Sequence, residues 1–195
     1  LAHALRATQA KVLFIGDECM EQLCATGGLP EEGLAIVQIA DAATPHAPRH
    51  PRAVDLAVAD TGGIQVGDFA ALRAGIDNRR PCFYIFTSGT TGLPKAALIS
   101  HGRFLSVGAG SLKEMPLGEE DVFYCAMPLF HGAALMSLYS TALQSGGTVL
   151  VRRRFSVSHF WPDVQAWRVT VFQYVGEVVR YLTNVAPVPG EKDHT

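Results

Sequence analysis

Short apolar runs alternate with segments whose apolar residues recur at helical spacing along most of the chain. Runs bounded by glycine, proline or charged residues are typical of buried strands, and apolar residues three or four apart are typical of helices packed on a sheet. The pattern predicts strands at 11–16, 34–40, 83–86, 96–99, 122–126, 148–152 and 169–175. It predicts helices at 1–10, 17–27, 68–74, 100–115, 129–143, 158–167 and 177–184, with Asp17 and Ser100 as N-caps. This alternation predicts an α/β fold with largely parallel sheets and flanking helices.

One stretch, 122–151, has no formally charged side chain and is long enough to raise the question of a membrane span. Pro128, His131 and the glycine pair at 146–147 divide it into a strand, a turn, a helix and a second strand. We therefore expect a buried core segment rather than a membrane helix. The residues expected on the buried face of its helix are Leu135, Leu138, Tyr139, Ala142 and Leu143.

The histidines and cysteines do not follow the spacing of a metal site. His46 and His50 are spaced as on one helix face, but the prolines of the 41–52 segment exclude a helix there, which favours solvated loop histidines. No Cys-x-x-Cys pair occurs, so we expect reduced packing residues rather than zinc ligands or disulfides. The cysteines are Cys19, Cys24, Cys82 and Cys125.

Composition and charge exclude one large class of function. A chain of 195 residues with 48% apolar and 17% charged residues can bury a sizeable core in one or two domains. Its formal net charge of -2, without an extended basic stripe, argues against nucleic-acid binding. The basic run Arg152–Arg154 is more typical of a solvated strand edge, with contact to anionic lipid as the alternative.

The densest group of polar residues lies between the strands predicted at 83–86 and 96–99. Its glycines let the main chain bend close to a ligand, its hydroxyl and amide groups can donate hydrogen bonds, and its lysine adds a positive charge. Such a loop suits a polyphosphate, whose oxygens all accept hydrogen bonds. It is not the common Gly-x-x-x-x-Gly-Lys-Ser/Thr loop, because Lys95 precedes Ala96, which has no hydroxyl for magnesium. The expected phosphate-binding residues are Thr87, Ser88, Gly89, Thr90, Thr91, Gly92 and Lys95.

The nine residues from Thr87 to Lys95 resemble the signature of the AMP-forming adenylating enzymes, the superfamily of acyl-CoA synthetases, luciferases and peptide-synthetase adenylation domains. The alanine pair after Lys95 and the stretches 83–86, 127–131 and 174–182 resemble one branch of it. That branch contains the long-chain and very-long-chain fatty acyl-CoA synthetases and the fatty acid transport proteins. The resemblance implies that the α/β fold is part of the large N-terminal domain of such a synthetase.

The resemblance also implies a site for the acyl substrate. His131 follows a strand and precedes a helix, where ligands collect in α/β sheets, and in the resembled family this position lies beside the acyl carboxylate. The catalytic candidate is therefore His131, although a helix-terminal histidine bonded to backbone is the alternative. Glu177 can also serve as a first-turn helix carboxylate. The implied acyl pocket consists of Phe130, His131, Tyr174, Gly176 and Glu177.

The chain is expected to be an internal piece of a longer enzyme. In the resembled family, the strand and helix at 174–182 precede the adenine-binding motif, the magnesium-binding glutamate, the ribose-binding aspartate, the hinge and a C-terminal domain with a catalytic lysine. None of these motifs is found here, so residues 1–195 are expected to be a partial AMP-binding (adenylation) domain without metal ligands of its own. The piece alone is expected to be inactive.

The implied reaction is the activation of a fatty acid by ATP to acyl-adenylate and then to acyl-CoA, with Mg²⁺ and CoA required. The expected partners are the fatty acid, ATP, CoA and the rest of the same chain, in the cytoplasm or peripherally on a membrane. Two alternatives remain open. One is a fatty-acid uptake or binding protein with a vestigial adenylation site, and the other is an adenylation domain for another carboxylic acid.

Overall fold

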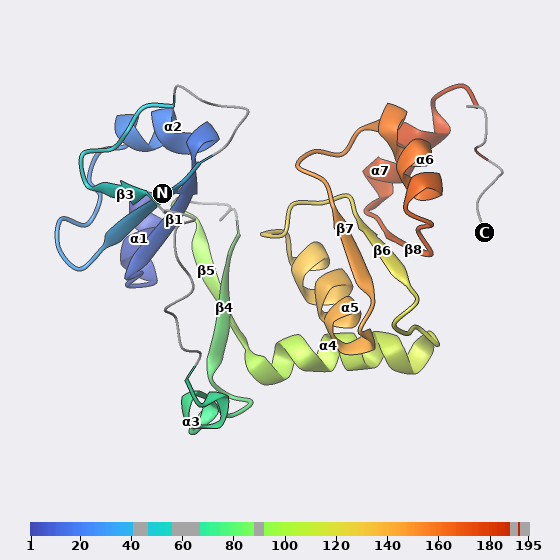
Figure 1. Ribbon diagram of the computed structural model, residues 1–195, viewed down its shortest axis with the longest axis horizontal. Coiled ribbons are helices and arrows are strands. Elements are labelled where there is room, and N and C mark those ends of the chain that lie inside the picture. The colour runs from blue at the N-terminus through green and yellow to red at the C-terminus, as the bar shows by residue number, and fades with distance from the viewer. Residues whose placement is uncertain (41–46, 56–66, 88–91, 188–190, 192–195) are drawn as a thin grey trace. The chain divides into compact units, whose positions relative to one another are not determined.

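The computed structural model describes residues 1–40, 47–55, 67–87, 92–187 and 191. The chain divides into two compact units, one made of Leu1–Ile76 with Phe86–Ala97 and the other of Asp77–Ile85 with Leu98–Thr195 (Figure 1). Each unit has its own sheet and its own buried apolar core.

The first unit is built on a three-stranded parallel sheet in the order β1-β2-β3. Its strands are β1 (Val12–Gly16), β2 (Ala35–Ile39) and β3 (Ala53–Asp55). Its helical segments are α1 (Ala2–Ala7), η1 (Asp17–Cys19), α2 (Met20–Ala25) and α3 (Phe69–Arg73). Met20 and Leu23 of α2 pack with Ile15 and Ile36 of the sheet, which accounts for the apolar runs around them. This arrangement confirms the strands predicted at 11–16 and 34–40.

Two details of the first unit differ from the sequence prediction. Asp17 does not cap a helix: it opens the short 3₁₀ helix η1, and its Oδ1 accepts a hydrogen bond of 2.6 Å from Nε2 of Gln38. Gln38 is buried, so its side-chain amide needs a hydrogen-bond partner. The Asp17 carboxylate serves as that partner instead of capping a helix. Strand β3 was not predicted, because it is short and follows the proline-rich segment 41–52.

A hairpin links the two units along the chain. Its strands, β4 (Pro81–Thr87) and β5 (Lys95–Ser100), pair in a two-stranded sheet. The connection between them is too short for a parallel crossover, so the pair is antiparallel. Ser100 then caps α4 (His101–Glu114), since its Oγ accepts a hydrogen bond of 3.2 Å from the N–H of Arg103, which confirms the predicted cap.

The second unit contains a three-stranded parallel sheet in the order β7-β6-β8. Its strands are β6 (Val122–Cys125), β7 (Thr148–Val151) and β8 (Val171–Gln173). The segments that follow them are η3 (Ala133–Tyr139), α5 (Ser140–Ser145), α6 (Val157–Ala166) and α7 (Gly176–Thr183).

Side chains alternate along the central strand β6. Phe123 and Cys125 pack in one cluster with η3 and α5, whereas Tyr124 packs in a second cluster with Phe160 of α6. Successive side chains of a strand point to opposite faces, so helices cover both faces of this sheet. The predicted α/β fold with largely parallel sheets is confirmed.

The uncharged stretch 122–151 folds as strand, helix and strand, as predicted, but its helix begins as a π-helix. The wider π turn shifts the later positions around the axis. Leu138 and Ala142 are buried as predicted, whereas Tyr139 is 37% and Leu143 58% exposed. None of the described helices combines the length and apolar character needed to cross a membrane.

Candidate functional site

The predicted phosphate loop begins at the end of β4 and ends at the start of β5. Ser88, Gly89, Thr90 and Thr91 lie outside the described residues. Thr87 and Lys95 face each other across the hairpin, with 3.5 Å between Thr87 Oγ1 and the carbonyl oxygen of Lys95. Gly92 has a φ of 111°, a conformation that favours glycine, so this glycine meets a backbone requirement as predicted. The side chain of Lys95 is exposed at the end of the hairpin.

The acyl-site candidates gather at the carboxyl edge of the second sheet. Strands β6 and β8 are parallel neighbours, so the segments that follow them leave from the same edge. The chain after β6 crosses to β7 on one side, whereas β8 lies on the other side. Ligands of open α/β sheets bind at such a switch point. The topology therefore brings Phe130 and His131 to the same edge as Tyr174, Gly176 and Glu177.

His131 is exposed and tied to the backbone through one ring nitrogen. Its Nδ1 accepts a hydrogen bond of 3.2 Å from the backbone N–H of Ala133, and the backbone N–H of His131 donates to the carbonyl of Pro128 at 2.8 Å. Because Nδ1 is an acceptor, the neutral ring carries its proton on Nε2. Nε2 has no partner among the described residues, so it can donate to a ligand. The neighbouring Phe130 is 81% exposed.

The second group of candidates lies at the start of α7. Glu177 is in the first turn and accepts a hydrogen bond of 2.9 Å from Nε of Arg180 within an exposed ion pair. This hydrogen bond lowers the pKa of Glu177 below its usual value. A Cβ atom at Gly176 would have no other atom within 4 Å, so the space beside this residue is open. The Tyr174 ring lies 5.8 Å from that of Phe172, centroid to centroid, and is largely exposed.

An apolar cavity of about 170 Å³ lies in the second unit, against strands β6 and β8. Its walls come from the end of α4, the helix pair η3–α5, and strands β6 and β8, and they include Met115, Phe123, Leu138 and Phe172. Gln173 also lines the cavity, and its buried Oε1 has no hydrogen-bond partner among the described residues.

None of the five predicted pocket residues lines this cavity. Leu138 had a sequence signal, because its helical spacing predicted burial. Met115 and Phe172 had none, since they meet only when separate elements pack together.

Comparison with known proteins gives a match over the whole chain. The model of one protein family, described as AMP-binding enzyme, matches residues 1–195. Long-chain fatty acid transport protein 2 of Rattus norvegicus is 34% identical over 198 residues, which cover 100% of this chain and 30% of that protein. Steroid-22-oyl-CoA synthetase of Rhodococcus jostii (strain RHA1) is 44% identical over 121 residues, which cover 62% of this chain and 22% of that protein. The chain thus spans less than a third of the length of these relatives.

Solved structures share the fold at low identity. The inhibitor-bound N-terminal domain of FACL13 from Mycobacterium tuberculosis matches with a TM-score of 0.64 and 19% identity, over 98% of this chain and 43% of that chain. ATP-bound MatB from Rhodopseudomonas palustris matches with a TM-score of 0.66 and 18% identity, over 94% of this chain and 33% of that chain. At this identity the likeness establishes the fold alone.

Proposed function

Since the chain belongs to the AMP-binding enzyme family, we propose that it is part of a long-chain or very-long-chain fatty acid-CoA ligase. Residues 1–195 would then be part of its AMP-binding domain. The observation that supports this acid is the apolar cavity against β6 and β8, because it offers an acyl chain a place away from water. The name of the fatty acid transport protein relative supports the same substrate class.

The proposed reaction has two steps. The fatty acid carboxylate attacks the α-phosphorus of ATP and releases pyrophosphate, and the CoA thiol then displaces AMP from the acyl-adenylate. The protein's contribution to such a transfer is mainly positioning and charge stabilisation. We assign Thr87, Lys95 and the loop between them to the β- and γ-phosphates, which also carry Mg²⁺. ATP use follows from the family, whereas Mg²⁺ and CoA belong to the proposal.

His131 is the proposed catalytic residue on the acyl side. Its Nε2–H, set by the hydrogen bond that Nδ1 accepts from Ala133, can donate to an oxygen of the acyl carboxylate. Such a bond would orient the attacking oxygen. Phe130, Tyr174, Gly176 and Glu177 are proposed to form the mouth of the acyl site, with the cavity lined by Phe172 taking the tail.

The leading alternative is a fatty-acid uptake or binding protein in which the phosphate loop performs no chemistry. The names of the fatty acid transport protein relatives support this alternative. A second alternative is an adenylation domain for another acid, because one relative is named for a steroid acid. For any of these we propose a cytoplasmic location, with peripheral attachment to a membrane.

Pyrophosphate release by the full-length protein separates these functions. A ligase should release pyrophosphate from ATP only when a fatty acid is present, and it should form acyl-CoA when CoA is added. A folded protein that binds fatty acid and ATP without releasing pyrophosphate would support the uptake function and contradict the ligase.

A further inference from the structure

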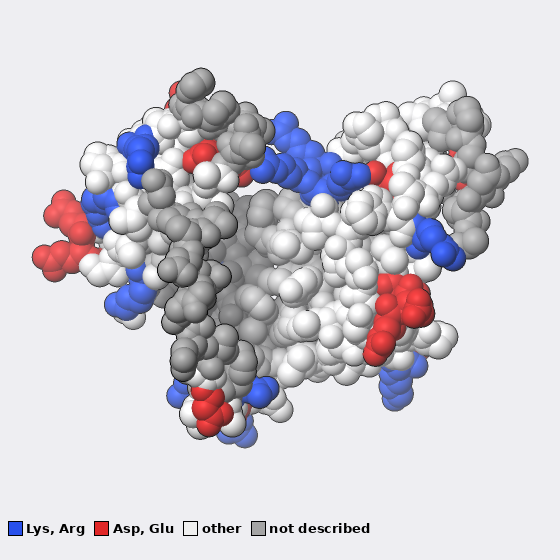
Figure 2. Space-filling view, in the orientation of Figure 1, with Lys and Arg blue, Asp and Glu red and all other residues white. Residues whose placement is uncertain are grey.

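A second pocket of the second unit lies at the end of β7 and shares no lining residue with the apolar cavity. It has a volume of about 370 Å³ and is lined chiefly by the arginine run that follows β7 and by the start of α6. Figure 2 shows Lys and Arg side chains gathered at the surface where this connection runs. The residues that matter for its chemistry are Tyr124, Arg152, Arg153, Arg154, His159 and Asp163.

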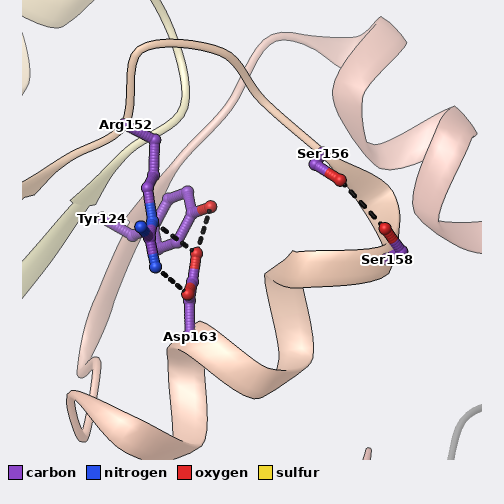
Figure 3. Close-up of polar contacts among 5 residues, drawn as sticks. All are labelled: Tyr124, Arg152, Ser156, Ser158 and Asp163. Atoms are coloured by element: carbon purple, nitrogen blue, oxygen red, sulfur yellow. Dashed lines mark hydrogen bonds and ion pairs between the residues drawn. The ribbon is translucent and has the colours of Figure 1, made fainter. Parts of the chain in front are cut away.

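The single carboxylate of this pocket is already neutralised. Asp163 is buried on α6, where its Oδ2 accepts a hydrogen bond of 2.8 Å from Nε of Arg152 and its Oδ1 contacts Nη2 of the same guanidinium (Figure 3). The hydroxyl of Tyr124 donates to Oδ2 at 3.2 Å. This network fixes Arg152 at the end of β7, with 43% of its side chain still exposed.

Apart from Val151, the remaining lining is positive or polar. Arg153 and Arg154 add two guanidinium groups, so the pocket has three of these groups against one carboxylate. Both are exposed, as is His159 in the first turn of α6. Guanidinium groups present paired N–H donors that match the oxygens of a phosphate, and they do so better than an ammonium group.

The start of α6 adds to this positive field. Ser156 is the N-cap residue, but its side chain makes no capping hydrogen bond, and its Oγ lies 3.0 Å from Oγ of Ser158 instead. The partial positive charge of the helix end is therefore not offset by a capping hydrogen bond from Ser156. The pocket and its arginines, rather than the helix end alone, define the site.

We propose that this pocket binds the phosphate group of a phosphate monoester. The site is distinct from the loop assigned above to the ATP phosphates, and it belongs to the carboxyl edge of the same sheet as His131. Two sources have this chemistry, namely a soluble phosphate ester and the headgroup of an anionic lipid. Arg154 is the residue expected to respond most clearly, because Arg152 is held by Asp163.

The test is a binding measurement on the full-length protein with glycerol 3-phosphate, using glycerol as the control ligand. Arg154→Ala should weaken binding about tenfold or more, because a charge-assisted paired contact is lost. Arg154→Lys should weaken it less. Lys113→Ala removes the same charge from the exposed surface of α4 and should leave the affinity within about twofold, as expected for a distant surface charge.

A vesicle measurement then identifies the source. If phosphatidylcholine vesicles containing phosphatidic acid bind the protein more tightly than pure phosphatidylcholine, and Arg154→Ala abolishes the difference, the ligand is a lipid headgroup. If only glycerol 3-phosphate binding depends on Arg154, the ligand is soluble. Equal losses in Arg154→Ala and Lys113→Ala, or no binding of either probe, would overturn the proposal. Turnover is not measured, so failure of the ligase function would not be confused with failure of this site.

Discussion

Lys95 is the residue on which the proposed chemistry depends most. Its exposed side chain stands at the start of β5, at the end of the loop assigned to the ATP phosphates. Lys95→Ala in the full-length protein should lower kcat/KM for ATP by roughly 10- to 100-fold, since a charge-assisted bond to phosphate contributes on the order of 1.5 to 3 kcal/mol. Pyrophosphate release measured against Lys113→Ala is the comparison. Equal activities of the two folded variants would contradict the assignment of the loop to the ATP phosphates.

Tyr124 provides a test of the buried network at high pH. Burial and the neighbouring Asp163 carboxylate raise the pKa of Tyr124 to about 12. The folded protein therefore holds this proton more tightly than the unfolded chain, in which tyrosine titrates near about 10. The free energy of unfolding should decrease as the pH rises from about 10 to about 12.

Tyr124→Phe isolates that effect. The variant loses the hydrogen bond to Asp163, so it should be less stable at neutral pH by about 1 kcal/mol. It should also show a smaller decrease in unfolding free energy above pH ~10, because the titrating hydroxyl is gone. Urea denaturation at several pH values measures both quantities. Parallel pH profiles for the two proteins would show that Tyr124 does not titrate as described.

Single residues differ in how far the sequence could predict them. Thr87, Gly92 and Lys95 were assigned to phosphate binding because their types and spacing suit phosphate oxygens, and this assignment stays a prediction. His131 was expected between a strand and a helix, and it lies between β6 and η3, whereas its catalytic role stays a prediction. The pairing of Arg152 with Asp163 could not be predicted, because it joins β7 to α6 through tertiary packing.

Among the elements, the contact between α4 and α5 depends on a glycine. A side chain at Gly108 would lie 2.6 Å from the carbonyl oxygen of Ser140, so the helices would have to separate. Ser140 Oγ donates to the carbonyl of Phe104 at 2.6 Å and fixes this close approach. Gly108→Ala should therefore destabilise the protein by about 1 to 3 kcal/mol.

Gly110 on the same helix is a matched control, because a side chain there would meet no atom within 4 Å. Gly110→Ala should stabilise the protein by about 0.5 to 1 kcal/mol through helix propensity alone. Urea denaturation of both variants gives the two changes. If both substitutions shift stability in the same direction, the close helix contact is not what requires Gly108.

The elements themselves were predicted well wherever periodicity was strong. Strands β1, β2 and β4 to β8 overlap the predicted apolar runs, and α3, α4, α6 and α7 lie where helices were predicted. The π-helix η3 was missed because a helical pattern assumes one constant period, and an inserted residue moves Tyr139 and Leu143 off the buried face. Strand β3 was missed because it is short and follows a proline-rich segment, and the use of Asp17 was missed because it depends on Gln38 of another strand.

At the scale of the whole molecule, the proposed function assigns phosphate binding to the hairpin and acyl binding to the second unit. The family match covers all 195 residues, whereas the matched segment covers 30% of the rat transport protein and 22% of the Rhodococcus synthetase. Activity, substrate and partners are therefore properties to be tested on the full-length protein. The central claim is that its substrate is a long-chain fatty acid.

Acyl-CoA formation by the full-length protein, measured for acids from acetate to very long chains below their micelle concentrations, tests this claim most directly. Each methylene buried in an apolar tunnel contributes ~0.8 kcal/mol, or roughly fourfold in binding. If the substrate is a long-chain fatty acid, kcat/KM should increase with chain length until the apolar cavity is filled. A maximum at acetate, an amino acid or an aryl acid would contradict the claim, and so would a folded, ATP-binding protein that activates no acid.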